Sequence, residues 1–148
     1  MRRHHNAIGI TLAAIALSAC GKPEFDRLPE DKVDATRKAN AESLGNKILG
    51  AWAKDEYPKL GDEAAEKFRS AHNPEDAQRA ADKSLEKEIG NFLSMTYAET
   101  HRTKDGKFEV YRFKGSFDKS KVPLEVRVVF DGDGKLTGFW VKPWKDGL

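Results

Sequence analysis

Apolar residues in the first half of the chain recur at the spacing of helices. A helix over about 33–55 is predicted, because its apolar positions are three or four residues apart and share one face: Ala41, Leu44, Ile48 and Trp52. A short second helix is predicted to begin next to Asp62. A third, over about 73–92, follows Asn73-Pro74, a favourable helix start.

After residue 93 the pattern changes to alternation, and β-branched and aromatic residues replace alanine. Four strands are predicted, at about 94–103, 107–117, 124–130 and 135–143. Tight turns at Asp105-Gly106 and Asp131-Gly132-Asp133-Gly134 join two of the pairs. Such short connections favour an antiparallel meander.

The predicted fold class is α+β, with three N-terminal helices packed on one face of a curved four-stranded antiparallel sheet. Alternation assigns Tyr111, Phe113, Val126, Val128 and Phe139, among others, to the helix-facing side. The opposite face is predicted to present the following residues: Arg112, Lys114, Arg127, Val129, Trp140 and Lys142.

The N-terminal segment has the pattern of an export signal. Arg2 and Arg3 precede an apolar run of about 12 residues, which is shorter than the roughly 20 of a membrane-spanning helix. The run ends at Leu17-Ser18-Ala19-Cys20-Gly21. That string resembles the lipobox of bacterial lipoproteins, and the resemblance implies cleavage before Cys20 and acylation of that residue.

This interpretation divides the 148-residue chain into a signal peptide (1–19), a lipidated cysteine with a tether (20–34) and one α+β domain (35–148). Because Gly21 rather than Asp follows the cysteine, the resemblance implies the outer membrane, facing the periplasm, in a Gram-negative cell. Cys20 is the only cysteine, so an internal disulfide is excluded.

The formal net charge of +2 would not be carried by the mature protein if the chain is divided in this way. Arg2 and Arg3 supply it, and both would be removed with the signal peptide. What remains is an asymmetry, with an acidic excess before Thr96 and a basic excess after it. A nucleic-acid partner is disfavoured, because the protein is predicted to be exported and has no basic motif interleaved with aromatic residues.

The helices and the meander suggest a second resemblance. Ile89-Gly90-Asn91-Phe92 at the end of the last helix and the stretch 128–138 are similar to small secreted domains with the nuclear transport factor 2-like, or cystatin-like, cone fold. The resemblance implies a curved sheet around a long helix, with a pocket between them. No motif matches the catalytic sets of that superfamily, so no catalytic residue is carried over.

Two candidate sites follow from the residues. Trp52, Tyr97, His101 and Tyr111 could line a pocket, as aromatic rings with polar tips, or simply fill the core. His101 is predicted to share a strand face with Tyr97 and Glu99, and a histidine beside a carboxylate could act as a general base.

The second candidate is an interaction face formed by Arg112, Arg127, Val129 and Trp140, because tryptophan beside arginine is typical of binding surfaces. This face could bind a partner or form a homodimer. No metal or cofactor site is predicted. Asp131-Gly-Asp-Gly lacks the later ligands of an EF-hand and is interpreted as a hairpin turn.

The favoured function is a noncatalytic, lipid-anchored envelope lipoprotein that binds a small ligand or a protein partner and contacts the membrane through Cys20. One alternative is an enzyme of the same cone fold with an unrecognised acid or base in its pocket. Another is a structural spacer of the envelope.

Overall fold

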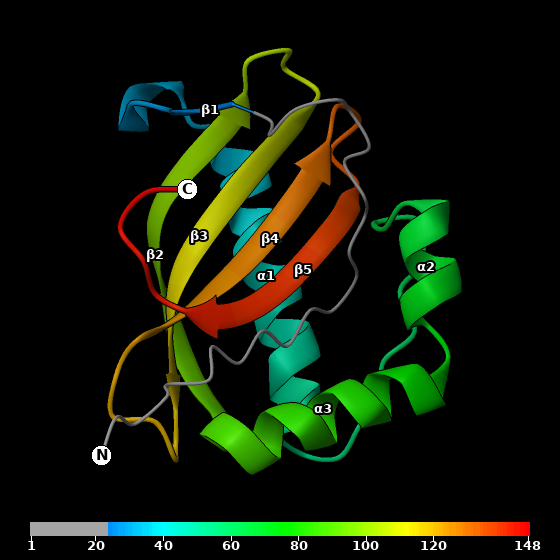
Figure 1. Ribbon diagram of the computed structural model, residues 1–148. Helices are drawn as coiled ribbons and strands as arrows, with labels where there is room; N and C mark the ends of the chain where they lie inside the picture. The colour runs from blue at the N-terminus through cyan, green and yellow to red at the C-terminus, as the bar shows by residue number, and fades with distance from the viewer. Residues whose placement is uncertain (1–23) are drawn as a thin grey trace.

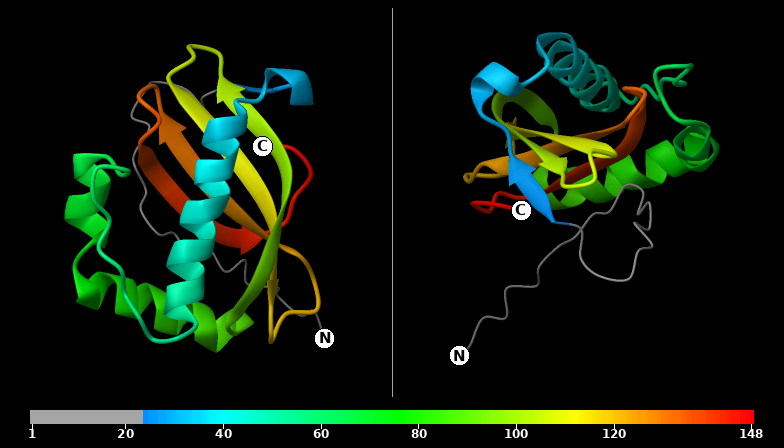
Figure 2. Two further views of the ribbon diagram at one scale, coloured as in Figure 1. Left: turned by 180° about the vertical axis from the view of Figure 1, so that it is seen from behind. Right: turned by 90° about the horizontal axis from the view of Figure 1, so that it is seen from above.

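Helix α1 (Ala35–Trp52) crosses one face of a five-stranded antiparallel sheet in the computed structural model, which describes residues 24–148 (Figures 1 and 2). The strands follow one another in the order β1-β2-β3-β4-β5. The other elements are β1 (Phe25–Arg27), the 3-10 turn η1 (Glu30–Lys32), α2 (Glu66–His72), α3 (Glu75–Ile89), β2 (Phe92–Thr103), β3 (Phe108–Phe117), β4 (Leu124–Asp131) and β5 (Leu136–Pro143).

The prediction of four strands after three helices is wrong. The fifth strand, β1, precedes the helices and lies inside the segment interpreted as a tether, where Phe25 pairs with Thr103 and Arg27 with His101. No alternation of apolar and polar residues marks this segment, because a strand of three residues joined to its neighbour through the backbone needs none. The helices therefore lie between strands along the chain.

The helix ends have local causes. The Asp34 side chain caps α1 by accepting a hydrogen bond from the Arg37 amide at 2.9 Å. Helix α3 ends at Ile89, before the predicted residue 92, because Gly90 adopts a φ of +86°. A side chain at Gly90 would also collide with the Asp118 carboxylate. Helix α2 begins only at Glu66, because Ala64 first forms a bridge to Leu136 of β5.

We call the sheet face that packs on α1 the inner face. The prediction of its core residues is confirmed, since Tyr111, Phe113, Val126, Val128 and Phe139 are each no more than 1% exposed. The helix residues Ala41, Leu44, Ile48 and Trp52 are also buried there. Close approach is possible because Gly45 of α1 lies against the Met95 side chain. Helix α2 lies beyond the β5 edge of the sheet, and α3 runs along its lower end (Figure 1).

Candidate functional site

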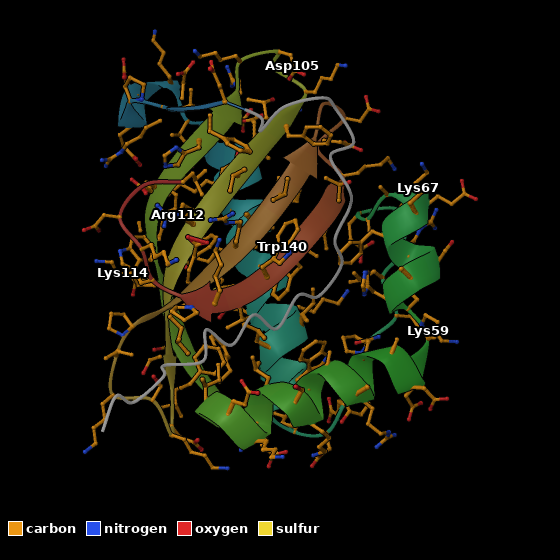
Figure 3. All side chains as sticks on the ribbon, viewed as in Figure 1. Lys59, Lys67, Asp105, Arg112, Lys114 and Trp140 are labelled. Carbon is orange, nitrogen blue, oxygen red and sulfur yellow. The ribbon has the colours of Figure 1, made fainter. Side chains whose placement is uncertain are left out.

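The face of the sheet that points away from α1, which we call the outer face, includes three adjacent rows of side chains, to which Arg112, Lys114 and Trp140 belong (Figure 3). Strand register sets these rows, because residues opposite each other in neighbouring strands share a face. The central row is Glu99, Arg112, Arg127 and Trp140. The flanking rows are Thr96, Lys114, Glu125 and Lys142 on one side, and His101, Val110, Val129 and Gly138 on the other.

The structure therefore brings together the residues of the predicted interaction face. They differ in exposure, since Arg112 is fully buried, Val129 is 8% exposed, and Arg127 and Trp140 are half-buried. Trp140 lies flat on the sheet because position 138 is glycine. A Cβ there would stand 2.3 Å from the indole ring.

Arg112 is the centre of a buried ion network. Its Nε lies 2.5 Å from Glu125 Oε1, and Nη1 pairs with Glu99. Nη2 donates to the carbonyl of Lys145 at 2.5 Å. Arg127 completes the network through Nε, 2.6 Å from Glu125 Oε2. Every arm of the Arg112 guanidinium is thus held in a fixed direction.

The C-terminal segment covers part of this network. The Trp144 ring lies over the Arg112 guanidinium at 4.3 Å and over the Lys114 ammonium at 4.9 Å. Cations above an aromatic face are stabilised by the electron-rich ring. Trp144 therefore holds two basic side chains of neighbouring rows, and Figure 1 shows this C-terminal segment crossing in front of the sheet.

Positively charged side chains outnumber carboxylates around Glu125 on the outer face. Burial, followed by the charge of Arg127, lowers the pKa of Lys142 below its usual value. The Lys142 ammonium remains 4.0 Å from Glu125, whose carboxylate is already shared by Arg112 and Arg127. An added anion at this place would relieve the repulsion among these cations.

The prediction that His101 shares a face with Tyr97 is wrong. A β-bulge between Tyr97 and Glu99 shifts the register and inverts the alternation. Tyr97 and Thr100 therefore point inward, where the hydroxyl groups lie 2.8 Å apart. Glu99 and His101 point outward, so the candidate general base lies on the opposite face from the predicted pocket.

His101 is buried beside Glu99, with Nε2 at 3.2 Å from the carboxylate. Neither ring nitrogen makes a hydrogen bond to another described residue. Burial alone would raise the pKa of Glu99, but the neighbouring His101 and Arg112 outweigh it and lower the pKa. The carboxylate is also paired with two arginines, Arg112 and Arg27, the latter at 3.2 Å.

The structure also separates the other predicted pocket residues. Tyr97 lies under Lys38 near the start of α1, and Tyr111 packs on Phe130. Trp52 is at the far end of α1, about 20 Å along a helix axis from Lys38. These aromatic side chains fill different parts of the core.

Trp52 lines a small cavity between α1, α2, α3 and β5. The cavity has a volume of about 20 Å³, which is room for about one water molecule. Gln78 accepts a hydrogen bond from the Trp52 indole at 3.0 Å, and His72 Nε2 faces the same region without a partner among the described residues. Burial lowers the pKa of His72.

The prediction of a hairpin turn at Asp131 is confirmed, since its carboxylate accepts from the amides of Asp133 and Lys135, each at 3.0 Å. Residues 24–148 contain no group of three or more metal-binding side chains that could hold an ion. Within the same range, no helix has the length and apolarity needed to cross a membrane. Cys20 lies outside the described residues.

Sequence reasoning missed the acidic members of the outer face. Glu125 is two residues before Arg127 in the same strand, so alternation could have placed both on one face. Glu99 could not have been placed, because the bulge precedes it. The stacking of Trp144 depends on the path of the chain after β5, which no periodic pattern describes.

A family model described as a protein of unknown function, DUF3887, matches residues 45–139. The match covers more than half of the chain and runs from the middle of α1 to β5. No curated protein and no solved structure gives a significant match. The lipobox and the similarity to the nuclear transport factor 2-like domains stay predictions.

Proposed function

The chain belongs to the DUF3887 family, and we propose that it is a noncatalytic, lipid-anchored envelope lipoprotein that binds a protein partner through its outer face. The anchor is Cys20, and the binding surface is centred on Arg127, Trp140 and Lys142. The partner is expected to present carboxylates, because Arg127 and Lys142 share a single acidic neighbour, the buried carboxylate of Glu125.

The observation that carries this proposal is the contrast between the small cavity beside Trp52 and the organised outer face. The cavity lined by Trp52 has room for about one water molecule, so it does not accommodate a metabolite. On the outer face, Trp140 is laid flat over Gly138 beside an arginine fixed by Glu125. Rigid aromatic and arginine side chains of this kind lose little entropy on binding.

The spacing between anchor and domain supports a position close to the membrane. Strand β1 begins at Phe25, so four residues, 21–24, separate Cys20 from the sheet. Four residues span at most about 14 Å when fully extended. A lipid at Cys20 would therefore hold the β1 edge near the bilayer, and a partner would reach the outer face from the side.

The partner is tested by in-cell crosslinking and co-purification of the tagged full-length protein. The double variant Arg127→Glu with Trp140→Ala is expected to lose the captured protein. The charge-matched control, Lys59→Glu with Trp140 retained, makes the same change of charge at an exposed cation away from the outer face and is expected to retain it (Figure 3). Equal capture by both variants, or a copy of the same chain as the captured protein, would contradict the proposal.

The anchor is tested separately with Cys20→Ser. The variant is expected to keep its signal peptide, to gain no lipid mass and to leave the membrane fraction under mild extraction. Unchanged processing with unchanged membrane association would disprove lipidation at this residue. That result would leave the outer-face proposal standing, because the two experiments report on different parts of the chain.

A further inference from the structure

A polar hollow lies at the lower end of the outer face, between strands β2 and β3 and the loop that follows β3. Its volume is about 280 Å³. It is lined by Ser94, Thr96, Lys114, Gly115, Ser116, Ser120, Lys121, Val122 and Pro123. We propose that this hollow is a binding site for a phosphate group, a function beyond the docking role proposed above and independent of it.

The chemistry of the lining carries the assignment. Two lysines and several hydroxyl groups face the hollow, and none of its lining residues is acidic. The ion pairs among the described residues do not include Lys114 or Lys121, so both positive charges are available to a ligand. Lysine ammonium groups and serine or threonine hydroxyls are suitable donors to the oxygens of a phosphate.

Strand register places the donors close together. Ser94 lies opposite Ser116, and Thr96 lies opposite Lys114, in two consecutive outward-facing pairs of β2 and β3. Three hydroxyls and one ammonium therefore form a compact patch on a rigid sheet. A ligand bound there would contact side chains whose backbone is fixed by the strand ladder.

The loop supplies the opposite wall. The Ser120 hydroxyl donates to the carbonyl of Val122 at 2.9 Å, which closes the turn that carries Lys121. Val122 is 64% exposed at the rim. The hollow is therefore preformed on both sides, with one lysine from the sheet and one from the loop.

Lys114 is positioned without losing its charge. Its ammonium is held 4.9 Å from the Trp144 ring centre, and the facing carboxylate, Glu125, is occupied by Arg112 and Arg127. A cation positioned by an aromatic ring keeps an unneutralised charge, whereas one paired with a carboxylate does not. This distinguishes Lys114 from the lysines of surface ion pairs such as Lys83, which contacts Asp55 and Glu86.

The first test is a titration of the full-length protein with inorganic phosphate at constant ionic strength, followed by amide NMR. Saturable shifts are expected at residues 94–96, 114–116 and 120–122, and chloride should not reproduce them. The variant Lys114→Gln with Lys121→Gln should weaken binding by about 10-fold or more, since each lysine supplies a charge-assisted contact. Weak, linear shifts spread over the surface would overturn the proposal.

Matched variants separate the site from general charge. Lys59→Gln with Lys67→Gln removes the same charge elsewhere and should leave the phosphate affinity unchanged (Figure 3). Equal weakening by both pairs would indicate nonspecific attraction and refute the site. Thermal unfolding of each variant checks that the fold is retained, and Lys114→Arg with Lys121→Arg should restore binding.

Two further probes identify the source of the phosphate. Glycerol phosphate represents a soluble ester, and vesicles of phosphatidylglycerol represent a lipid headgroup. If the site takes a soluble ester, glycerol phosphate shifts the same amides and the vesicles do not compete. If it takes a headgroup, the vesicles compete in a manner that depends on Lys114 and Lys121. Failure of all three phosphate probes would overturn the proposal, whatever the outcome of the crosslinking experiment.

Discussion

The two faces of the same strands are buried by different chemistry. On the inner face, alternate residues such as Phe113 and Val126 exclude water through apolar contact with α1. On the outer face, Arg112 and Glu125 are equally buried but satisfy each other as ions. Apolar burial supplies net stability, whereas a buried ion pair mainly offsets its own desolvation. The comparison teaches that stability resides on the inner face and fixed side-chain geometry on the outer face.

The largest effect is expected from a cavity on the inner face. Phe113→Ala removes a fully buried ring that packs edge-on against Tyr97 at 5.9 Å. The free energy of unfolding should fall by about 3–5 kcal/mol in urea denaturation. Lys114→Ala, one residue away on the outer face, should change it by no more than about 0.5 kcal/mol. Similar losses of unfolding free energy in the two variants would contradict the view that stability resides on the inner face.

The next effect comes from leaving a buried charge unpaired. Glu125→Gln keeps the side-chain shape but removes the carboxylate shared by Arg112 and Arg127. The free energy of unfolding should fall by about 3 kcal/mol, the low end for a broken buried pair, because Glu99 still contacts Arg112.

A double-mutant cycle separates pairing from packing at this place. Arg112→Met alone should also destabilise the protein, because it leaves Glu125 with fewer cations. The double variant should lose less than the sum of the two single losses, as expected for groups in direct contact. Additive losses would show that Arg112 and Glu125 act through their apolar stems and not as an ion pair.

The sequence was sufficient to predict the inner face. Strict alternation in β3, β4 and β5 identified Phe113, Val126 and Phe139, because any regular strand with one apolar face points such residues to the core. It also grouped Arg112, Arg127 and Trp140 on the other face. Strands β3 and β4 contain no irregularity before these residues, and the register shift of β5 lies between Leu136 and Gly138, so alternation is regular from Gly138 onward.

The failures occurred where structure depends on contacts between distant segments. A bulge after Tyr97 exchanges the inward-facing and outward-facing positions of β2. Nothing in the local sequence marks the bulge, so His101 was assigned to the wrong face. Strand β1 is held by its neighbour and not by its own pattern. The pairing of Arg112 with Glu99 and Glu125 required strand register, which alternation does not define.

A smaller effect is expected at the glycine under Trp140. Gly138→Ala places a methyl group within the space of the indole ring, so the ring must leave its position on the sheet. The cost should be about 1 kcal/mol, the low end for overpacking, because Trp140 is half-buried and can turn toward solvent. Tryptophan fluorescence and near-UV circular dichroism should report the displacement.

Removal of the ring provides the control for this variant. Trp140→Ala vacates the space of the ring, so adding Gly138→Ala to it should cost little further, since Val129 Cβ, at 3.3 Å, is then the closest neighbour. A persisting loss in the double variant would mean that the glycine serves the backbone and not the ring. The single variant Gly138→Ala also tests the functional difference between the two faces. It should weaken partner capture by the outer face while leaving the packing of the inner face intact.

The smallest effect is a pH dependence that differs between the two faces. The pKa of His72, beside the cavity on the inner side, is lowered by burial from 6.5, so the fold favours the neutral ring. Between pH 6.5 and the folded-state pKa, the unfolded chain binds more protons, and stability must fall as the pH falls. The pKa of Glu99 on the outer face is also lowered, from 4.5, because the fold favours its charged form. Its contribution is present above pH 4.5 and is lost as the pH falls through the folded-state pKa.

Urea denaturation at a series of pH values separates these two windows. His72→Leu should flatten the stability profile just below pH 6.5 and leave the acidic window unchanged. Glu99→Gln should flatten the profile below pH 4.5 and leave the His72 window unchanged. The two faces share the same strands, so a variant that altered both windows would show that the ion network and the core titrate as one unit. Independent windows would instead mean that substitutions on the outer face can change recognition without a matching cost in the core.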